Sequence, residues 1–226
     1  MTGLVCLQGG GEFSPGCVPM DTDLARRGAG RVVVTALAGT VGRDYRTATD
    51  NGVRHFRGLG AGDVVGAPDA REDREGALAV LRTARLLVLP GGSPSRLLEA
   101  LLSTGAAEVV AELLADDVVV SGSSAGAMVL GSWTVLPDRG GSAGVQVAPG
   151  LGLVPDVLVV PHWSGARGDW VRAIEAQVPA EVTVLGIPEE SGVLVAGGGL
   201  TAVGRTATTL VRHQLDLDLH QTWRKP

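Results

Sequence analysis

The chain has 226 residues, of which 45% are hydrophobic and 3% aromatic, and its formal net charge is −5. This length and apolar content suffice for one large core, so the sequence predicts a single domain over 1–226, with 216–226 as a polar tail. The negative charge disfavours nucleic acid and anionic membrane surfaces as partners, and no apolar run reaches the ~20 residues that span a bilayer.

The cysteines and the N-terminal residues predict a cytoplasmic protein. Cys6 lies in an apolar run and Cys17 in a loop rich in Gly and Pro. Two cysteines are too few for a disulfide framework, and their spacing is not that of a metal site. No basic segment precedes the first apolar stretch, which ends at Gly9, so it reads as a strand and not as a signal peptide. We expect neither a metal nor a cofactor.

Short apolar runs alternate along the chain with longer stretches of helical spacing. This alternation is typical of a mostly parallel sheet covered by helices on both faces, so the predicted fold is α/β, a three-layer α/β/α sandwich. The expected strands are 3–8, 31–37, 63–67, 85–89, 118–120, 157–160, 182–187, 193–196, 201–203 and 208–211. The expected helices are 18–27, 41–56, 71–84, 94–103, 106–115, 125–130 and 168–177, and 132–152 reads as loops or short strands.

A Gly-rich turn, Gly9-Gly-Gly-Glu-Phe13, follows the first predicted strand. It resembles a phosphate-cradling loop. However, it lacks the G-x-G-x-x-G spacing followed by a helix, so dinucleotide binding is disfavoured.

A second Gly-rich turn, Pro90-Gly-Gly-Ser-Pro94, ends the strand at 85–89. Ser93 can cap the helix that follows, and Pro94 suits its first turn. The carboxyl ends of parallel strands lie on one edge of a sheet, where such folds bind ligands. We therefore expect Gly91 beside the substrate and the Gly92 N–H as an oxyanion donor. The alternative is a helix-entry turn without chemistry.

The segment Gly122-Ser-Ser-Ala-Gly126 fits G-x-S-x-G, the nucleophile elbow, and stands between a predicted strand and a predicted helix as that motif requires. Gly122 and Gly126 would let the helix pass close to the strand, because a larger side chain at either place would crowd the bend. Ser124 is therefore the predicted nucleophile. The Ala125 N–H, at the start of the helix, is a predicted oxyanion donor. An ordinary Gly-rich turn is the alternative.

A serine hydroxyl becomes a good nucleophile only when a positioned base takes its proton. Of the four histidines, only His162 directly follows an apolar strand, which places it on the same sheet edge as Ser124. His162 is therefore the predicted base. Three carboxylates remain open as the acid that orients the imidazole: Asp138 on the loop after the elbow, and Glu189 or Glu190 at the end of a neighbouring strand.

Taken together, the motifs resemble those of the serine peptidases that include aspartyl dipeptidase (dipeptidase E) and cyanophycinase. That family has the class I glutamine amidotransferase-like fold, which is flavodoxin-like. The 38 residues from Ser124 to His162 are similar to the family's interval between nucleophile and histidine. The motifs that carry the resemblance are Gly9-Gly-Gly-Glu12, Gly91-Gly92, Gly122-Ser-Ser-Ala-Gly-Ala127, Pro161-His-Trp163 and Gly186-Ile-Pro-Glu189.

The resemblance implies a role for individual residues. Ser124 would be the nucleophile, His162 the base, Asp138 the orienting acid, Gly92 and Ala125 the oxyanion donors, and Arg167 the reader of a substrate's aspartyl side chain. Glu189 is expected beside the substrate when it is not the acid. The chain departs from the family at Ser93-Pro94, where Asn or Asp is usual, and in a shortened loop, Trp163-Ser-Gly-Ala166, before the arginine. The substrate is thus open.

The function expected from these residues is that of a serine hydrolase. It would cleave a peptide or isopeptide bond next to an acidic residue through an acyl-enzyme, acting on a small peptide-like substrate as a monomer or homodimer. A serine at the elbow disfavours glutamine amidotransfer, which uses a cysteine in this fold. The alternatives are an esterase with the same elbow and a non-catalytic amidotransferase-like domain that binds a ligand in the crevice.

Overall fold

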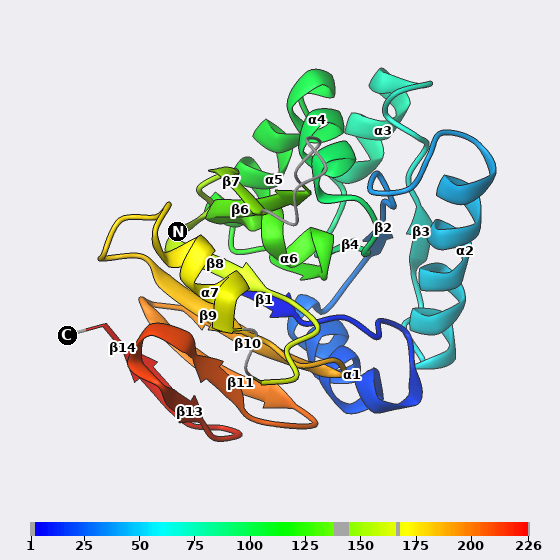
Figure 1. The fold of residues 1–226 in the computed structure, drawn as a ribbon. Helices are drawn as coiled ribbons and strands as arrows, with labels where there is room; N and C mark the ends of the chain where they lie inside the picture. Colours follow the sequence, from blue (N-terminus) through cyan, green and yellow to red (C-terminus); the bar gives the residue numbers. More distant parts are fainter. Residues whose placement is uncertain (1–2, 138–144, 166–167, 226) are drawn as a thin grey trace.

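The computed structural model describes residues 3–137, 145–165 and 168–225, whose strands form two β-sheets with helices packed around them (Figure 1). The larger sheet contains β1 (Val5–Gln8), β2 (Val32–Val34), β3 (Val64–Gly66), β4 (Leu86–Leu89), β5 (Val119–Ser123), β10 (Ser191–Ala196), β11 (Gly199–Gly204) and β14 (Thr222–Arg224). Its order is β14-β11-β10-β1-β5-β4-β2-β3. The strands from β1 to β3 in this order are parallel, and β10, β11 and β14 are antiparallel to their neighbours.

The smaller sheet has six strands in the order β13-β12-β9-β8-β6-β7. These are β6 (Gly131–Pro137), β7 (Val145–Pro149), β8 (Val154–Val160), β9 (Thr183–Gly186), β12 (Thr208–Leu210) and β13 (Leu215–Leu217). The central strands β6, β8 and β9 are parallel, and the outer strands pair antiparallel.

Helices lie on both sides of the larger sheet, and α7 (Gly168–Glu175) packs against the smaller one (Figure 1). The others are α1 (Val18–Gly28), α2 (Arg43–Gly58), α3 (Arg74–Leu81), α4 (Pro94–Thr104), α5 (Ala106–Ala115) and α6 (Ala125–Leu130), with short 3-10 turns at Pro15–Cys17 and Val211–His213. The side chain of Ser93 accepts from the Arg96 N–H at the start of α4, which confirms the predicted cap. None of the helices in the described ranges is both long and apolar enough to cross a bilayer.

Alternate residues of the larger sheet bury opposite faces. On β1, Val5 and Leu7 pack into the core shared with α4, α5 and the smaller sheet, whereas Cys6 packs with Leu24 and Phe56 from α1 and α2. A third cluster joins the smaller sheet to α7. Burial on both faces explains why these strands read as continuous apolar runs.

The predicted α/β fold is confirmed, but two details of the prediction are wrong. The strands form two sheets and not one. A short apolar run indicates a strand, but it does not indicate with which strand it pairs. Residues 132–152, predicted as loops or short strands, contain most of β6 and all of β7, which pair with each other at one side of the smaller sheet. The segment 216–226, expected to be a polar tail, instead supplies most of β13 and all of β14, one edge strand in each sheet.

Candidate active site

Ser124 occupies the turn between β5 and α6 with φ 48° and ψ −109°, a conformation that non-glycine residues rarely adopt. Such strain costs on the order of 1–3 kcal/mol and persists where the surroundings impose it. Here the N–H of Ser124 donates to the Gln8 carbonyl oxygen at 3.0 Å. A Cβ on Gly122 would lie 2.5 Å from the backbone of Gly126, and one on Gly126 would lie 2.1 Å from the Leu89 carbonyl oxygen. The predicted need for both glycines is confirmed.

His162 lies two residues beyond the end of β8, and its ring faces Ser124. The Oγ atom of Ser124 is 2.9 Å from Nε2 of His162, so the structure brings these two predicted residues into hydrogen-bond contact. His162 has φ 52°, and its N–H donates to the Gly9 carbonyl oxygen at 2.8 Å. The imidazole lies over Gly10, where an added Cβ would be 2.3 Å from Cε1 of the ring and where φ is +120°. Only glycine fits at this position.

A carboxylate stands on the other side of the imidazole. Oε1 of Glu189, on the loop after β9, lies 3.0 Å from Nδ1 of His162. Both side chains are partly open to solvent, with 46% of His162 and 62% of Glu189 exposed. Asp138 lies outside the described residues.

The neighbouring Glu190 anchors the same loop. Its N–H donates to the Gly10 carbonyl oxygen at 2.9 Å, and its carboxylate accepts from Ser14 Oγ at 2.8 Å and from Arg205. The hydrogen bond from Arg205, assisted by that from Ser14, lowers the pKa of Glu190 below its ordinary value. Glu190 is therefore held away from the imidazole that Glu189 contacts.

The Gly91-Gly92 loop borders Ser124, as expected for strand ends that share one edge of a sheet. A Cβ on Gly91 would lie 3.1 Å from Cβ of Ser124. Gly92 has φ +141°, and its N–H donates no hydrogen bond within the described part of the chain. Ala125 is the first residue of α6, where backbone N–H groups have no partner within the helix. These are the two amides predicted as oxyanion donors.

Glu12 is a site residue to which the sequence analysis gave no role of its own. Its carboxylate accepts the Gly91 N–H at 2.8 Å and the Ser123 hydroxyl at 3.0 Å, so it joins the Gly91-Gly92 loop to the elbow. The feature of the sequence that could have indicated Glu12 was the Gly-rich turn that contains it, which resembles a phosphate-cradling loop. In the structure, this turn leaves space for the imidazole of His162 and places Glu12 between the Gly91-Gly92 loop and Ser123.

Arg167, the predicted reader of a substrate carboxylate, lies outside the described residues. Within those residues, no group of three or more His, Cys, Asp or Glu side chains is arranged to hold a metal ion.

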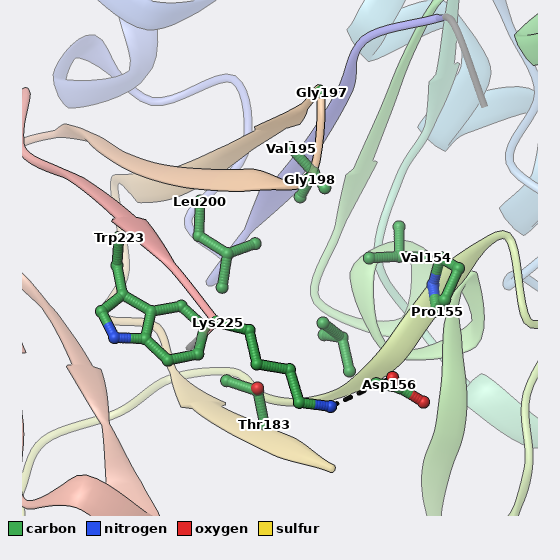
Figure 2. A pocket seen from close by; sticks show the side chains of 11 residues that line it. Val154, Pro155, Asp156, Thr183, Val195, Gly197, Gly198, Leu200, Trp223 and Lys225 are labelled. Carbon is green, nitrogen blue, oxygen red and sulfur yellow. Dashed lines mark hydrogen bonds and ion pairs between the residues drawn. The ribbon is translucent and has the colours of Figure 1, made fainter. Parts of the chain in front are cut away.

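A cavity of about 280 Å³ lies between the two sheets (Figure 2). Its place is at the edge opposite the Ser124–His162 pair. It is lined by the first residues of β8, such as Val154, and by the Gly197-Gly198 turn, whereas His162 follows the other end of β8. Trp223 and Leu200 line it from β14 and β11, and Lys225 pairs with Asp156 at 3.1 Å beside them. No residue of the candidate site borders this cavity.

Comparison with known proteins shows to which family the chain belongs. A model of peptidase family S51 matches residues 22–203, most of the chain. The chain belongs to peptidase family S51. Two curated relatives, the cyanophycinases of Trichormus variabilis and of a Nostoc species, are each 28% identical to it over 205 residues. That alignment covers 84% of this chain and 66% of each cyanophycinase, so the chain spans slightly less than two thirds of their length.

Solved structures share the S51 chain's fold. A crystal structure of a peptidase from an acI-B1 Actinobacterium superposes with a TM-score of 0.79 at 21% identity, covering 100% of this chain and 98% of that one. A putative peptidase E from Listeria monocytogenes superposes with a TM-score of 0.65 at 18% identity, covering 91% of this chain and 100% of the other. The expected resemblance to the dipeptidase E and cyanophycinase group is confirmed.

Proposed function

We propose that this S51 protein is a serine peptidase whose triad is Ser124, His162 and Glu189. The observation that supports this best is the unbroken series of contacts from Ser124 Oγ to His162 Nε2, and from His162 Nδ1 to Glu189 Oε1, at 2.9 and 3.0 Å. With Nδ1 protonated toward Glu189, Nε2 is free to accept the serine proton. We assign the acid to Glu189 in place of Asp138, because Glu189 has this contact.

The reaction proceeds through an acyl-enzyme. Oγ of Ser124 attacks the carbonyl carbon of the scissile bond while Nε2 of His162 takes the hydroxyl proton, and the carbonyl oxygen becomes an oxyanion facing the Gly92 and Ala125 amides. Collapse of this intermediate breaks the C–N bond, and His162 gives its proton to the leaving amine. A water molecule, deprotonated by His162, then hydrolyses the ester and restores Ser124.

We further propose that the bond cleaved lies next to an acidic residue. The support is the resemblance to the aspartyl dipeptidase and the kinship with two cyanophycinases. Arg167 would pair with the substrate carboxylate through its two-pronged guanidinium, a contact that lysine cannot reproduce. Arg167→Lys should therefore lower kcat/KM for an Asp-containing peptide and leave the matched Asn peptide almost unchanged. If Arg167→Lys lowers kcat/KM equally for both peptides, Arg167 does not bind the substrate carboxylate and the proposed acidic preference is contradicted.

The test of the proposed chemistry begins with a fluorophosphonate probe and a panel of dipeptides and isopeptides, half of them acidic. Wild type should be labelled at Ser124 and should hydrolyse an acidic member. Ser124→Ala should abolish labelling and lower kcat by about 10⁴- to 10⁶-fold. Ser132→Ala is the matched control and should keep full activity, because the Ser132 hydroxyl lies on β6 and bonds to the backbone of Val154 and Asp156 on β8.

The other outcomes each favour a different function. An esterase would be labelled and would cleave short-chain esters but no peptide. A ligand-binding domain would show neither labelling nor turnover. Turnover near the wild-type level in Ser124→Ala would contradict the proposed mechanism.

A further inference from the structure

Glu12 connects the two backbone segments that flank the reacting serine. Its Oε1 atom accepts the Gly91 N–H at 2.8 Å, and its Oε2 atom accepts the Ser123 hydroxyl at 3.0 Å. Each of these partners directly precedes a residue with a part in the proposed reaction, since Gly92 follows Gly91 and Ser124 follows Ser123. The carboxylate therefore acts on the reacting groups through their neighbours.

The packing around this contact leaves little freedom. A Cβ placed on Gly91 would lie 2.7 Å from Oε1 of Glu12 and 3.1 Å from Cβ of Ser124, so the loop is held between these two side chains. Ser123 is 4% exposed. Hydrogen bonds to an ionised carboxylate are roughly twice as strong as those between neutral groups, and burial strengthens them further.

Two of the three backbone N–H groups of the loop donate hydrogen bonds, and the one between them has no acceptor among the described residues. The N–H of Gly91 is taken by Glu12, and that of Ser93 donates to the Ala38 carbonyl oxygen at 3.1 Å. Between them, Gly92 with φ +141° has an N–H that donates to no described residue. Fixing the amides of Gly91 and Ser93 restricts the orientations open to the Gly92 amide between them.

We propose that Glu12 is a positioning residue that fixes the Gly91-Gly92 loop against Ser124, so that the Gly92 N–H faces the oxyanion. This inference rests on the proposed peptidase function. An oxyanion donor contributes chiefly in the transition state, so the loss of its alignment lowers kcat and leaves KM nearly unchanged.

The experiment compares Glu12→Ala and Glu12→Gln with Ser123→Ala and with Glu99→Ala, an exposed control on the outer face of α4. On the best dipeptide of the panel, Glu12→Ala should lower kcat by about 10²-fold with KM changed less than about threefold. Glu12→Gln keeps an oxygen that can accept the Gly91 N–H and should retain activity within about tenfold of wild type. Ser123→Ala removes only the second hydrogen bond and should lie between wild type and Glu12→Ala.

A second measurement follows the loop without any substrate. Hydrogen exchange of the backbone amides over 86–96 should be faster in Glu12→Ala than in wild type and unchanged in Glu99→Ala. Thermal unfolding of each variant, measured in parallel, separates a local release of the loop from a general loss of stability.

The outcomes distinguish this inference from the proposed function. If wild type neither cleaves a panel member nor reacts with the probe, the proposed function fails and the exchange data alone decide whether Glu12 fixes the loop. If wild type is active and Glu12→Ala keeps its kcat within about threefold, the peptidase stands and the role of Glu12 is overturned. Equal losses in Glu12→Ala and Glu12→Gln, in proportion to lost thermal stability, would also overturn it.

Discussion

Glu189 and Glu190 are adjacent in sequence, but their carboxylates contact different residues. Glu189 stands 3.0 Å from the imidazole of His162, while Glu190, with φ 57°, turns toward Ser14 and Arg205. The left-handed backbone of Glu190 sends the two side chains in different directions. One carboxylate can therefore serve the histidine while the other holds the loop.

This contrast gives a prediction for the acid of the proposed triad. Glu189→Gln should lower kcat by up to about 10⁴-fold, because the amide neither selects the correct imidazole tautomer nor stabilises the imidazolium. Glu190→Gln and Asp138→Asn should each cost much less. The measurement is kcat and kcat/KM on one acidic dipeptide for the three variants. If Asp138→Asn is the crippling change and Glu189→Gln is mild, the acid assigned here is wrong.

What the sequence could reveal of the site depended on how local each signal was. The G-x-S-x-G motif that indicates the bend lies within two residues of Ser124, so the bend was predictable. Gly10 needs to be glycine because a ring more than 150 residues away fills the space above it, and no local pattern carries that information. Asp138 and Glu189 were both candidates from the sequence, and no local pattern could select Glu189, because its contact with the imidazole is tertiary.

At the scale of elements, Tyr45 links α2 to the loop after β3. The only tyrosine of the chain, it is 3% exposed, and its hydroxyl donates to the carbonyl oxygens of Ala67 and Pro68 and lies 3.0 Å from Thr35 Oγ1. Burial raises the pKa of Tyr45 to about 12.

This raised pKa predicts an alkaline loss of stability with a definite sign. The fold favours the protonated phenol, so the stabilisation is fully present below the unfolded value near 10 and is lost as pH rises through about 12. The shift corresponds to about 2–3 kcal/mol. Phenolate absorbance, which here reports Tyr45 alone, should titrate near pH 12 in the folded protein and near 10 in urea.

The control for this titration is Tyr45→Phe. Burial also raises the pKa of the Cys6 and Cys17 thiols, so wild type alone cannot isolate the tyrosine. The free energy of unfolding of wild type should fall toward that of Tyr45→Phe between pH 10 and 12. A folded-state phenolate midpoint near 10 would contradict the burial argument.

At the scale of the whole molecule, the last residues tie the two sheets together. In β14, Trp223 pairs in register with Leu200 of β11 and packs against the main core. Figure 2 shows both side chains at the cavity between the sheets. The alternation in Leu215-Asp-Leu217 and Thr222-Trp-Arg224 was the available strand signal. Each run is only three residues long, which is why a polar tail was predicted instead.

Trp223→Ala should therefore lower the free energy of unfolding by about 1–3 kcal/mol, because it removes a partly buried aromatic side chain. It should also promote aggregation, since a weakened β14 exposes the edge of β11. Urea unfolding and light scattering measure the two effects. The control is Lys225→Ala, which removes only a half-exposed ion pair and should cost about 0–1 kcal/mol. Equal effects of the two changes would mean that β14 adds no packing energy.

The division of the proposed triad between the two sheets has a consequence for how the proposed activity arises during folding. Ser124 follows a strand of the larger sheet, whereas His162 and Glu189 follow strands of the smaller one. The chain leaves the larger sheet after α6, builds β6 to β9, and returns with β10 beside β1. Such non-local closure is slow compared with helix formation. Recovery of hydrolysis after dilution from denaturant should thus lag behind the recovery of helical signal. The rate at which hydrolysis recovers then measures how fast the two sheets join.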